Sequence, residues 1–294
     1  MDMIYWDHYY NAIIVANLAI VIALFATLRF SSGAISHVRA SHELFTKDNP
    51  AFGISLAGAM AGITIMLSGT IYGSPENDIL HSIVSVGVFG ALGIFLMALT
   101  RIIFDKLTLP AVNLREQIIS GNIAVALADA GNVIATAIIL RAVMIWVEVT
   151  SVEGIIALFL GFGVAQLLLT SLTILKRKAF DIANKGNIVQ DGLNSGNIAI
   201  GLRFAGIKIG SAFAIATAAK VVVYEVFGLS VILGGWFIAA LMAILAWKIL
   251  TLIAEKLIFF KVDVSKEIVE QKNTALGATQ AVIYIAMGIL IYSL

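Results

Sequence analysis

The sequence predicts an all-α polytopic membrane protein. It has eight transmembrane helices, arranged as four parallel helical-hairpin repeats around a pseudo-symmetry axis normal to the membrane. The prediction depends on the composition, on the distribution of basic residues and on a fourfold internal repeat. The chain has 294 residues, of which 60% are hydrophobic and 13% charged, whereas soluble domains have about 45–50% apolar and 25% charged residues. Such a composition is typical of a membrane protein.

The same composition excludes several kinds of functional site. A formal net charge of +1 indicates no nucleic-acid partner. The chain has no cysteine, and so it has no disulfide, no thiolate metal ligand and no thiol nucleophile. The four histidines are scattered without metal-ligand spacing, and no nucleophile-elbow, zinc-protease or paired-carboxylate motif is present. We therefore expect no catalytic residue, no metal, no cofactor and no enzymatic activity.

Eight apolar runs are long enough to cross the bilayer core, which needs ~20 helical residues. The chain starts "MDMIYWDHYYN", with Asp2 and Asp7 but no Lys or Arg. A signal peptide begins with a basic region, so we expect the first run to be retained as a helix. The predicted spans are Ala12–Phe30, Pro50–Ile71, Ile79–Phe104, Ile123–Val147, Ile155–Leu175, Ile198–Val223, Leu229–Ile253 and Thr274–Tyr292.

Basic residues lie mostly in four of the seven connectors. The connectors between helices 1 and 2, 3 and 4, 5 and 6, and 7 and 8, with the end of helix 7, hold 15 of the 19 basic residues. The opposite loops, such as "YGSPENDI" and "WVEVTSVEG", contain acids and no Lys or Arg. The positive-inside rule therefore places the basic connectors in the cytoplasm and both termini outside it.

A repeated pattern starts each even-numbered helix. An asparagine is followed by alanine after two residues, by glycine or alanine after four and by alanine after eight, and an acid precedes each asparagine by six positions. The asparagines are 73, 75 and 76 residues apart. The asparagines are Asn49, Asn122, Asn197 and Asn273, and the acids are Glu43, Glu116, Asp191 and Glu267. The chain is therefore a fourfold repeat of helical hairpins.

The repeat predicts how the helices pack. Each hairpin returns the chain to the same side of the membrane, so the repeats are parallel. The halves 1–148 and 149–294 are interpreted as two four-helix membrane domains that arose by duplication. Positions two, nine and thirteen after each asparagine share one helix face, positions four and eight share another, and small residues there allow close approach. We expect the even-numbered helices inside and the odd-numbered helices, rich in Leu, Ile and Phe, against lipid.

The repeated asparagines and acids each allow two interpretations. Asparagine is a favourable N-cap residue, so the four asparagines would cap the even-numbered helices. Alternatively, they form a ring at a cytoplasmic mouth. The acids are either solvated or paired with connector bases, or they ring an entrance, where carboxylates favour cations.

Polar residues inside the predicted spans are candidates for function, because burying them in a bilayer is costly. They are Asp129, Asn132, Arg203, Lys208 and Gln280. Asp129 and Lys208 fall on one helical face, so Asp129 pairs with Lys208 or Arg203 in one interpretation, fixing the register of helices 4 and 6. In the other interpretation, the five residues line a solvated path or a substrate site. Two bases against one acid leave excess positive charge, which favours an anionic ligand.

The segment "DNPAFGISLAGAMAG", which follows a polar connector, resembles the domain-of-unknown-function 350 family, the YjfL-like uncharacterised inner-membrane proteins. The resemblance covers essentially the whole chain as two tandem copies of a four-helix domain. The second copy departs from the pattern, because Asn197 is followed by Ile in place of Pro and its interior carries Arg203 and Lys208. The resemblance implies an integral protein of the bacterial inner membrane, with no established activity. Members are thought to accompany envelope-stress and membrane-remodelling proteins.

Two functions follow from these expectations. The first is a small channel or transporter with a polar route between the even-numbered helices. The second is a membrane scaffold or docking protein whose cytoplasmic connectors bind a peripheral envelope-stress protein or anionic lipid. A hydrated cavity that reaches Lys208 would favour transport, whereas a dry interior with buried ion pairs would favour the scaffold.

Overall fold

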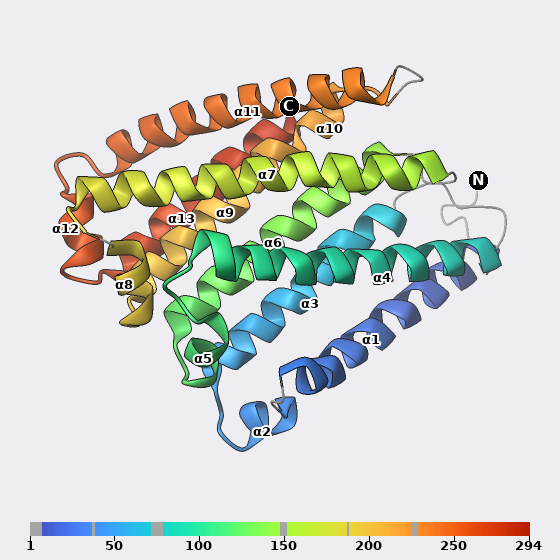
Figure 1. Cartoon of the computed structure of the whole chain (residues 1–294), viewed down its shortest axis with the longest axis horizontal. Helices are drawn as coiled ribbons and strands as arrows, with labels where there is room; N and C mark the ends of the chain where they lie inside the picture. The colour runs from blue at the N-terminus through green and yellow to red at the C-terminus, as the bar shows by residue number, and fades with distance from the viewer. Residues whose placement is uncertain (1–7, 37–38, 72–78, 148–151, 187, 225–227) are drawn as a thin grey trace, which may run out of the picture.

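The computed structural model describes residues 8–36, 39–71, 79–147, 152–186, 188–224 and 228–294, which are almost entirely helical and include no strand (Figure 1). The long helices are α1 (His8–Ser36), α3 (Pro50–Ile71), α4 (Ile79–Ile103), α6 (Ile123–Trp146), α7 (Val152–Ala183), α9 (Ile198–Ala216), α11 (Leu229–Ile258) and α13 (Thr274–Ser293). The short elements are α2 (Ala40–Phe45), the π-helix η1 (Phe104–Thr108), α5 (Leu114–Ile119), α8 (Ile188–Asn194), α10 (Ala218–Val221) and α12 (Val264–Val269).

The predicted spans agree closely with the long helices. Within the described residues, seven helices are long and apolar enough to cross a membrane, and α1 contributes a shorter apolar stretch, Asn11–Thr27. Two predicted spans are too short, because α7 continues to Ala183 and α11 to Ile258. The predicted span from Ile198 is interrupted, since α9 ends at Ala216 and α10 follows. The loops expected outside the cytoplasm lie largely beyond the described residues.

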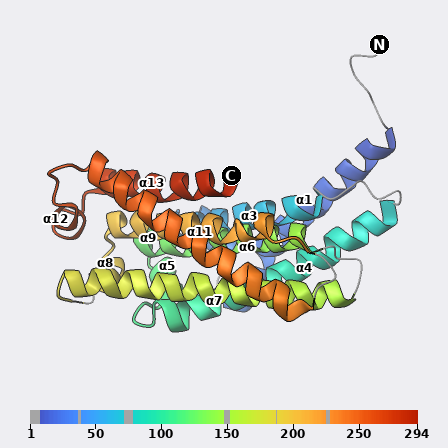
Figure 2. The ribbon, with the colours of Figure 1, turned by 90° about the horizontal axis from the view of Figure 1, so that it is seen from above.

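The even-numbered helices of the prediction, α3, α6, α9 and α13, lie side by side in that order as one row, which we call the row helices (Figure 1). Helices α4, α7 and α11 pack against the row helices, with α4 and α7 on one side of the row, and α1 packs against α3 and α4 (Figure 2). We number the hairpins as repeats 1 (α1–α3), 2 (α4–α6), 3 (α7–α10) and 4 (α11–α13). The predicted arrangement around a central axis is therefore wrong, because the repeats follow one another sideways.

The angle between two helix faces explains the row. Glycines nine residues after the asparagine face the next repeat, whereas alanines eight residues after it face the previous one. Three pairs show this contact: Gly58 with Ala130, Gly131 with Ala205, and Gly206 with Ala281. Glycines four residues after the asparagine also face the previous repeat, since Gly201 and Gly277 meet alanines at position two of that repeat. Positions four and eight therefore form one face, and positions two, nine and thirteen form the other. At 3.6 residues per turn the centres of these two faces are ~140° apart, whereas four helices closed around an axis need about 90°. The repeats therefore form a gently curved row.

The backbones of the row helices approach closely at these contacts. A Cβ atom added to any of the three glycines would lie less than 3.0 Å from the Cα atom of the facing alanine. Only glycine fits there, and close backbone approach is the main source of packing energy between helices in lipid. The contact between α6 and α9, which joins halves 1–148 and 149–294, is as close as the other two.

Burial follows the order of the row. In the membrane-spanning segment of α6, 83% of the residues are buried, and in that of α9 72% are buried. The corresponding share is 39% in α3 and in α13, at the two ends of the row. Only 17% of the membrane-spanning segment of α11 is buried. Helix α11 therefore exposes mostly Leu, Ile, Met and Phe side chains. The two central row helices are the inner layer that the small residues predicted, whereas α3 and α13 each leave one edge open.

Candidate functional site

The four asparagines stand at identical turns between a short helix and a row helix. The residue before each asparagine has a positive φ: 49° at Asp48, 89° at Gly121, 74° at Gly196 and 50° at Lys272. This left-handed conformation reverses the chain after the short helix, and it suits glycine, which repeats 2 and 3 use. The backbone N–H of each asparagine then donates to a carbonyl five or six residues earlier. The turns place α2, α5, α8 and α12 at one end of the row (Figure 1).

Each asparagine side chain caps its row helix. The Oδ1 atom of Asn122 accepts from the N–H of Val125, that of Asn197 from Ile200 and that of Asn273 from Leu276. In repeat 1, Asn49 Oδ1 accepts from Ala51 and Phe52. The asparagines are therefore N-cap residues, and they follow the row and do not form a ring.

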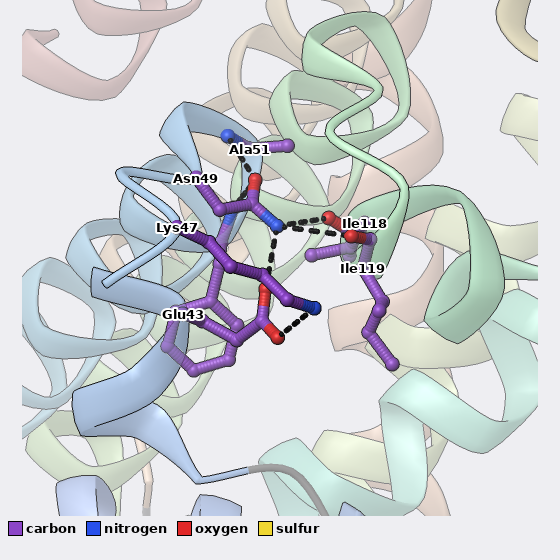
Figure 3. A network of polar contacts seen from close by, with 7 residues as sticks. Glu43, Lys47, Asn49, Ala51, Ile118 and Ile119 are labelled. Atoms are coloured by element: carbon purple, nitrogen blue, oxygen red, sulfur yellow. Dashed lines mark hydrogen bonds and ion pairs between the residues drawn. The ribbon is translucent and has the colours of Figure 1, made fainter. Parts of the chain in front are cut away.

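The Nδ2 group of three asparagines also bonds to the next repeat. Asn49 donates to the carbonyls of Ile118 (3.0 Å) and Ile119 (3.2 Å) at the end of α5 (Figure 3). Asn122 donates in the same way to the Leu193 carbonyl (2.8 Å), and Asn197 to that of Ile268 (2.9 Å). We call these hydrogen bonds the asparagine contacts. They link α3, α6 and α9 to the short helix of the following repeat.

The four acids have different surroundings. Glu43 accepts from Asn49 Nδ2 (2.9 Å) and pairs with Lys47 (2.7 Å), and Figure 3 shows both contacts. Burial raises the pKa of the Glu43 carboxyl, but the hydrogen bonds from Lys47 and Asn49 outweigh it, so the pKa is lowered.

The other three acids make no shared ring. Glu267 accepts from Asn273 Nδ2 (2.8 Å), as Glu43 does from its own asparagine. In repeat 2, Gln117 takes this role with Asn122 (2.7 Å), and Glu116 accepts from Asn113 at the start of α5. Asp191 is exposed. The alternative interpretation, a ring of carboxylates, is therefore not formed by these residues, because the repeats stand in a row.

Asp129 lies at the interface of repeats 1 and 2, and its partner is Arg101 of α4. Arg101 Nη2 lies 2.6 Å from Asp129 Oδ2, and Ser55 Oγ of α3 donates to the same oxygen at 2.5 Å. The Asp129 side chain is 1% exposed, whereas that of Arg101 is 46% exposed. The predicted pairing of Asp129 with Lys208 or Arg203 is wrong, because the covering helix α4 supplies the cation. Arg101 lies near the end of the predicted span Ile79–Phe104, among the basic residues counted with the following connector, so the repeat pattern does not single it out.

Lys208 and Asn132 are buried without polar partners among the described residues. Lys208 is fully buried, and its Nζ lies 5.2 Å from the centre of the Phe104 ring with no hydrogen bond. Asn132 is 1% exposed, and neither polar atom of its side chain has a partner within the described residues. Their burial places these two side chains in the packed interior of the described residues.

A second polar cluster lies at the interface of repeats 3 and 4. Glu255 of α11 accepts from Gln280 Nε2 and from Tyr284 Oη, both at 2.6 Å. Lys176 of α7 lies over the rings of Trp247 (4.7 Å) and Tyr284 (5.4 Å). Of the predicted polar residues, only Gln280 and Arg203 belong here. The sequence pattern does not identify Lys176 and Glu255, because the predicted spans end at Leu175 and Ile253 and so leave both residues in connectors.

The two clusters occupy equivalent positions in the repeat. Asp129 and Gln280 are each seven residues after their asparagine, and Ser55 and Arg203 are each six residues after theirs. The interface between repeats 2 and 3 has Phe204 at the seventh position, packed against Phe104 with 5.8 Å between ring centres. Polar clusters therefore lie within each half of the chain, and the boundary between the halves is apolar around Lys208.

A surface hollow of about 370 Å³ lies beside α5, and none of the intramembrane polar residues lines it. Its lining residues are Asn113, Arg115, Glu116, Ile119 and Ser120. The hollow therefore belongs to the end of the row that carries the short helices.

Comparison with known proteins gives one family. The model of the Domain of Unknown Function (DUF350) matches residues 5–144, 78–219 and 149–294. Successive matches begin about one hairpin apart and overlap, so each match covers two neighbouring repeats. No curated protein and no solved structure matches the chain.

Proposed function

The chain belongs to the DUF350 family, and from its packed row of hairpins we propose that it is a membrane scaffold that displays four short helices to a peripheral protein. The short helices α2, α5, α8 and α12 are held in line by the asparagine contacts. By the distribution of basic residues, this end of the row faces the cytoplasm. The protein would then reside in a bacterial inner membrane with both termini outside the cytoplasm.

The observation that carries the proposal is the continuity of the row. The asparagine contacts and the glycine–alanine contacts repeat at each interface between neighbouring hairpins. A scaffold needs a fixed spacing between its docking elements, and a single packed row supplies it. The short helices expose charges of both signs, including Glu116 of α5, Asp191 of α8 and Lys266 of α12, which suits a polar partner.

The scaffold is favoured over a channel for a physical reason. The backbones of the row helices are in contact, so a water-filled route between them would require the row to open. Asp129, the acid among the predicted pathway residues, already binds Arg101 and Ser55 through its Oδ2 atom, although its buried Oδ1 has no partner among the described residues. An acid held in this way stabilises the packing of α3, α4 and α6 and does not need a mobile ion.

Charge reversal on α12 tests the scaffold. The variant Lys266→Glu with Glu270→Lys changes two exposed residues, and Lys178→Glu on the exposed side of α7 is the matched control. We expect peripheral proteins that co-purify with the chain from native membranes to be lost from the α12 variant and kept by the control. Equal recovery from both variants would remove the support for docking at this end.

A second candidate function, transport, is favoured by one observation. Lys208 and Asn132 are buried without hydrogen-bond partners in the described part of the chain, and such groups in a membrane often mark a substrate or ion path. Transport predicts that purified protein in liposomes carries an ion flux that Lys208→Leu abolishes. Equal flux through the intact protein and through Lys208→Leu would count against transport.

A further inference from the structure

The junction of α7, α9, α11 and α13 holds more positive than negative charge. Lys176 of α7, Arg203 of α9 and Glu255 of α11 are half-buried there, and Lys248 of α11 is exposed. The charges of Arg203, Glu255 and Lys248 all act on Lys176. Three cations therefore surround one carboxylate, and the cluster retains a net positive charge.

The cations of this cluster are not neutralised by a direct ion pair. Within the described residues, the hydrogen bonds to Glu255 come from the neutral groups of Gln280 and Tyr284. Lys176 Nζ lies over two aromatic rings, and the Arg203 guanidinium lies 4.2 Å from the centre of the Phe180 ring. Arg203 Nε is buried and has no hydrogen-bond partner among the described residues. The Arg203 side chain also donates a hydrogen bond to Tyr284, so Arg203 Nε and the ammonium group of Lys176 are the donors that remain available to an anion.

The equivalent position in the first half is different. There Arg101 and Asp129 form an ion pair at 2.6 Å, and Ser55 completes it. In the second half the Ser55 position is occupied by Arg203 and the Asp129 position by the neutral Gln280. The exchange removes an acid and adds a cation at the same place in the repeat. The asymmetry between the halves is therefore one of charge.

The cations of the cluster lie about two helical turns from the ends of their helices. Arg203 lies six residues after Asn197, and Lys176 lies seven residues before the end of α7 at Ala183. At 1.5 Å per residue, both are about 10 Å from the ends of their helices. Glu255 is three residues from the end of α11. The side chains of Lys176 and Arg203 can reach the boundary between acyl chains and headgroups from that depth.

We propose that Lys176 and Arg203 bind the phosphate group of an anionic lipid, with Lys248 at the entrance. Guanidinium and ammonium groups form strong charge-assisted hydrogen bonds with phosphate oxygens, and basic clusters between transmembrane helices bind anionic headgroups. The rings of Trp247, Tyr284 and Phe180 hold both cations in place by cation–π contacts. The binding site does not depend on the scaffold function.

Titration of purified protein with phosphatidylglycerol tests the site. Protein in nanodiscs of phosphatidylcholine, with and without phosphatidylglycerol, would be examined by native mass spectrometry for retained lipid, and short-chain phosphatidylglycerol would give an apparent affinity. The variant is Lys176→Gln with Arg203→Gln. The control, Lys178→Gln with Lys256→Gln, removes two exposed cations from α7 and α11, the helices that carry Lys176 and Lys248.

We expect the Lys176 and Arg203 variant to bind phosphatidylglycerol about 25-fold more weakly, at about fivefold for each cation, and the control to bind as the wild type does. Glu255→Gln should bind about fivefold more tightly, because it removes the one negative charge and keeps an acceptor for Gln280 and Tyr284. A structural role for these residues would not predict tighter binding. If the double variant fails to fold, Glu255→Gln decides, and unchanged or weaker binding by it overturns the proposal.

Inorganic phosphate separates the two possible sources of the ligand. If millimolar phosphate displaces phosphatidylglycerol from the wild type but not from the Lys176 and Arg203 variant, the site recognises phosphate and its ligand is a soluble one. Resistance to phosphate, together with the 25-fold loss in the variant, supports the lipid. Equal binding of phosphatidylglycerol by wild type and double variant overturns the site.

Discussion

At the scale of single residues, one asparagine side chain serves two helices. Its oxygen caps the row helix of its own repeat, while its Nδ2 donates to the short helix of the next. Both partners are backbone groups that a helix terminus leaves unsatisfied. Aspartate could cap equally well but has no donor for the second contact. This explains why asparagine, and no other capping residue, stands at the start of the first three row helices. Asn273 of the last repeat donates to Glu267 of its own repeat instead.

Glu43 makes the first of these turns dependent on pH. Its folded-state pKa is lowered from the ordinary value of 4.5, so its stabilising contribution is complete above that value and is lost as the pH falls through the lowered one. Glu43→Gln should cost about 1 kcal/mol at pH 7, because the charged hydrogen bonds are lost.

Thermal unfolding in mild detergent at pH 7 and at pH 3 measures the effect. Wild type should lose stability at low pH relative to Glu43→Gln, so that the difference between the two proteins narrows. An Asp191→Asn variant, which changes an exposed acid of repeat 3, is the control and should not alter the pH dependence. A constant difference between wild type and Glu43→Gln would contradict the assignment.

At the scale of elements, the row helices are held together by glycines whose neighbours leave no room for a side chain. Gly131 faces the Ala205 backbone, and a Cβ atom there would force α6 and α9 apart. Gly163 of α7 offers a contrast, because a Cβ atom at that position would meet nothing within 4 Å. Glycine content alone therefore does not identify a packing position in this chain.

The two glycines predict opposite effects of the same substitution. Gly131→Ala should destabilise the protein by about 1–3 kcal/mol through overpacking. Gly163→Ala should stabilise it by up to about 1 kcal/mol, because alanine is the better helix former and the space is open. Unfolding of each variant by denaturing detergent gives the sign directly. Equal stability of the two variants would show that the α6–α9 contact is looser than described.

The sequence predicts where each helix begins and ends far better than it predicts which helices pack against one another. Apolar length located the spans, and the asparagine repeat located the turns, since both are local signals. The partner of Asp129 could not be found in this way, because Arg101 comes from a helix in the second layer and its position depends on the order of the row. The row could have been predicted from the sequence, because the positions of the small residues after each asparagine place the two packing faces ~140° apart.

At the scale of the whole molecule, the four turns lie at one end of the row, and the chain has no cysteine, so single cysteines can report on the topology. Asp191→Cys and Lys272→Cys lie beside the short helices, and Ser293→Cys lies at the opposite end of α13; all three positions are exposed. We expect an impermeant maleimide to label Ser293→Cys in intact cells and the other two only after the membrane is opened.

Detergent-treated membranes, in which all three cysteines should react, are the control for accessibility. The reverse pattern would place the short helices outside the cytoplasm. Labelling of all three from one side would contradict a chain of parallel hairpins.

The last repeat differs from the others at the position nine residues after its asparagine. Repeats 1 to 3 have glycine there, whereas repeat 4 has Val282, whose side chain is 64% exposed at the open edge of α13. The opposite edge exposes Ala57 of α3, which occupies the alanine position of the repeated contact. A building block whose two ends match would add copies of itself without limit. We expect the branched side chain of Val282 to keep the α3 edge of another molecule from approaching as closely as neighbouring hairpins do within the chain.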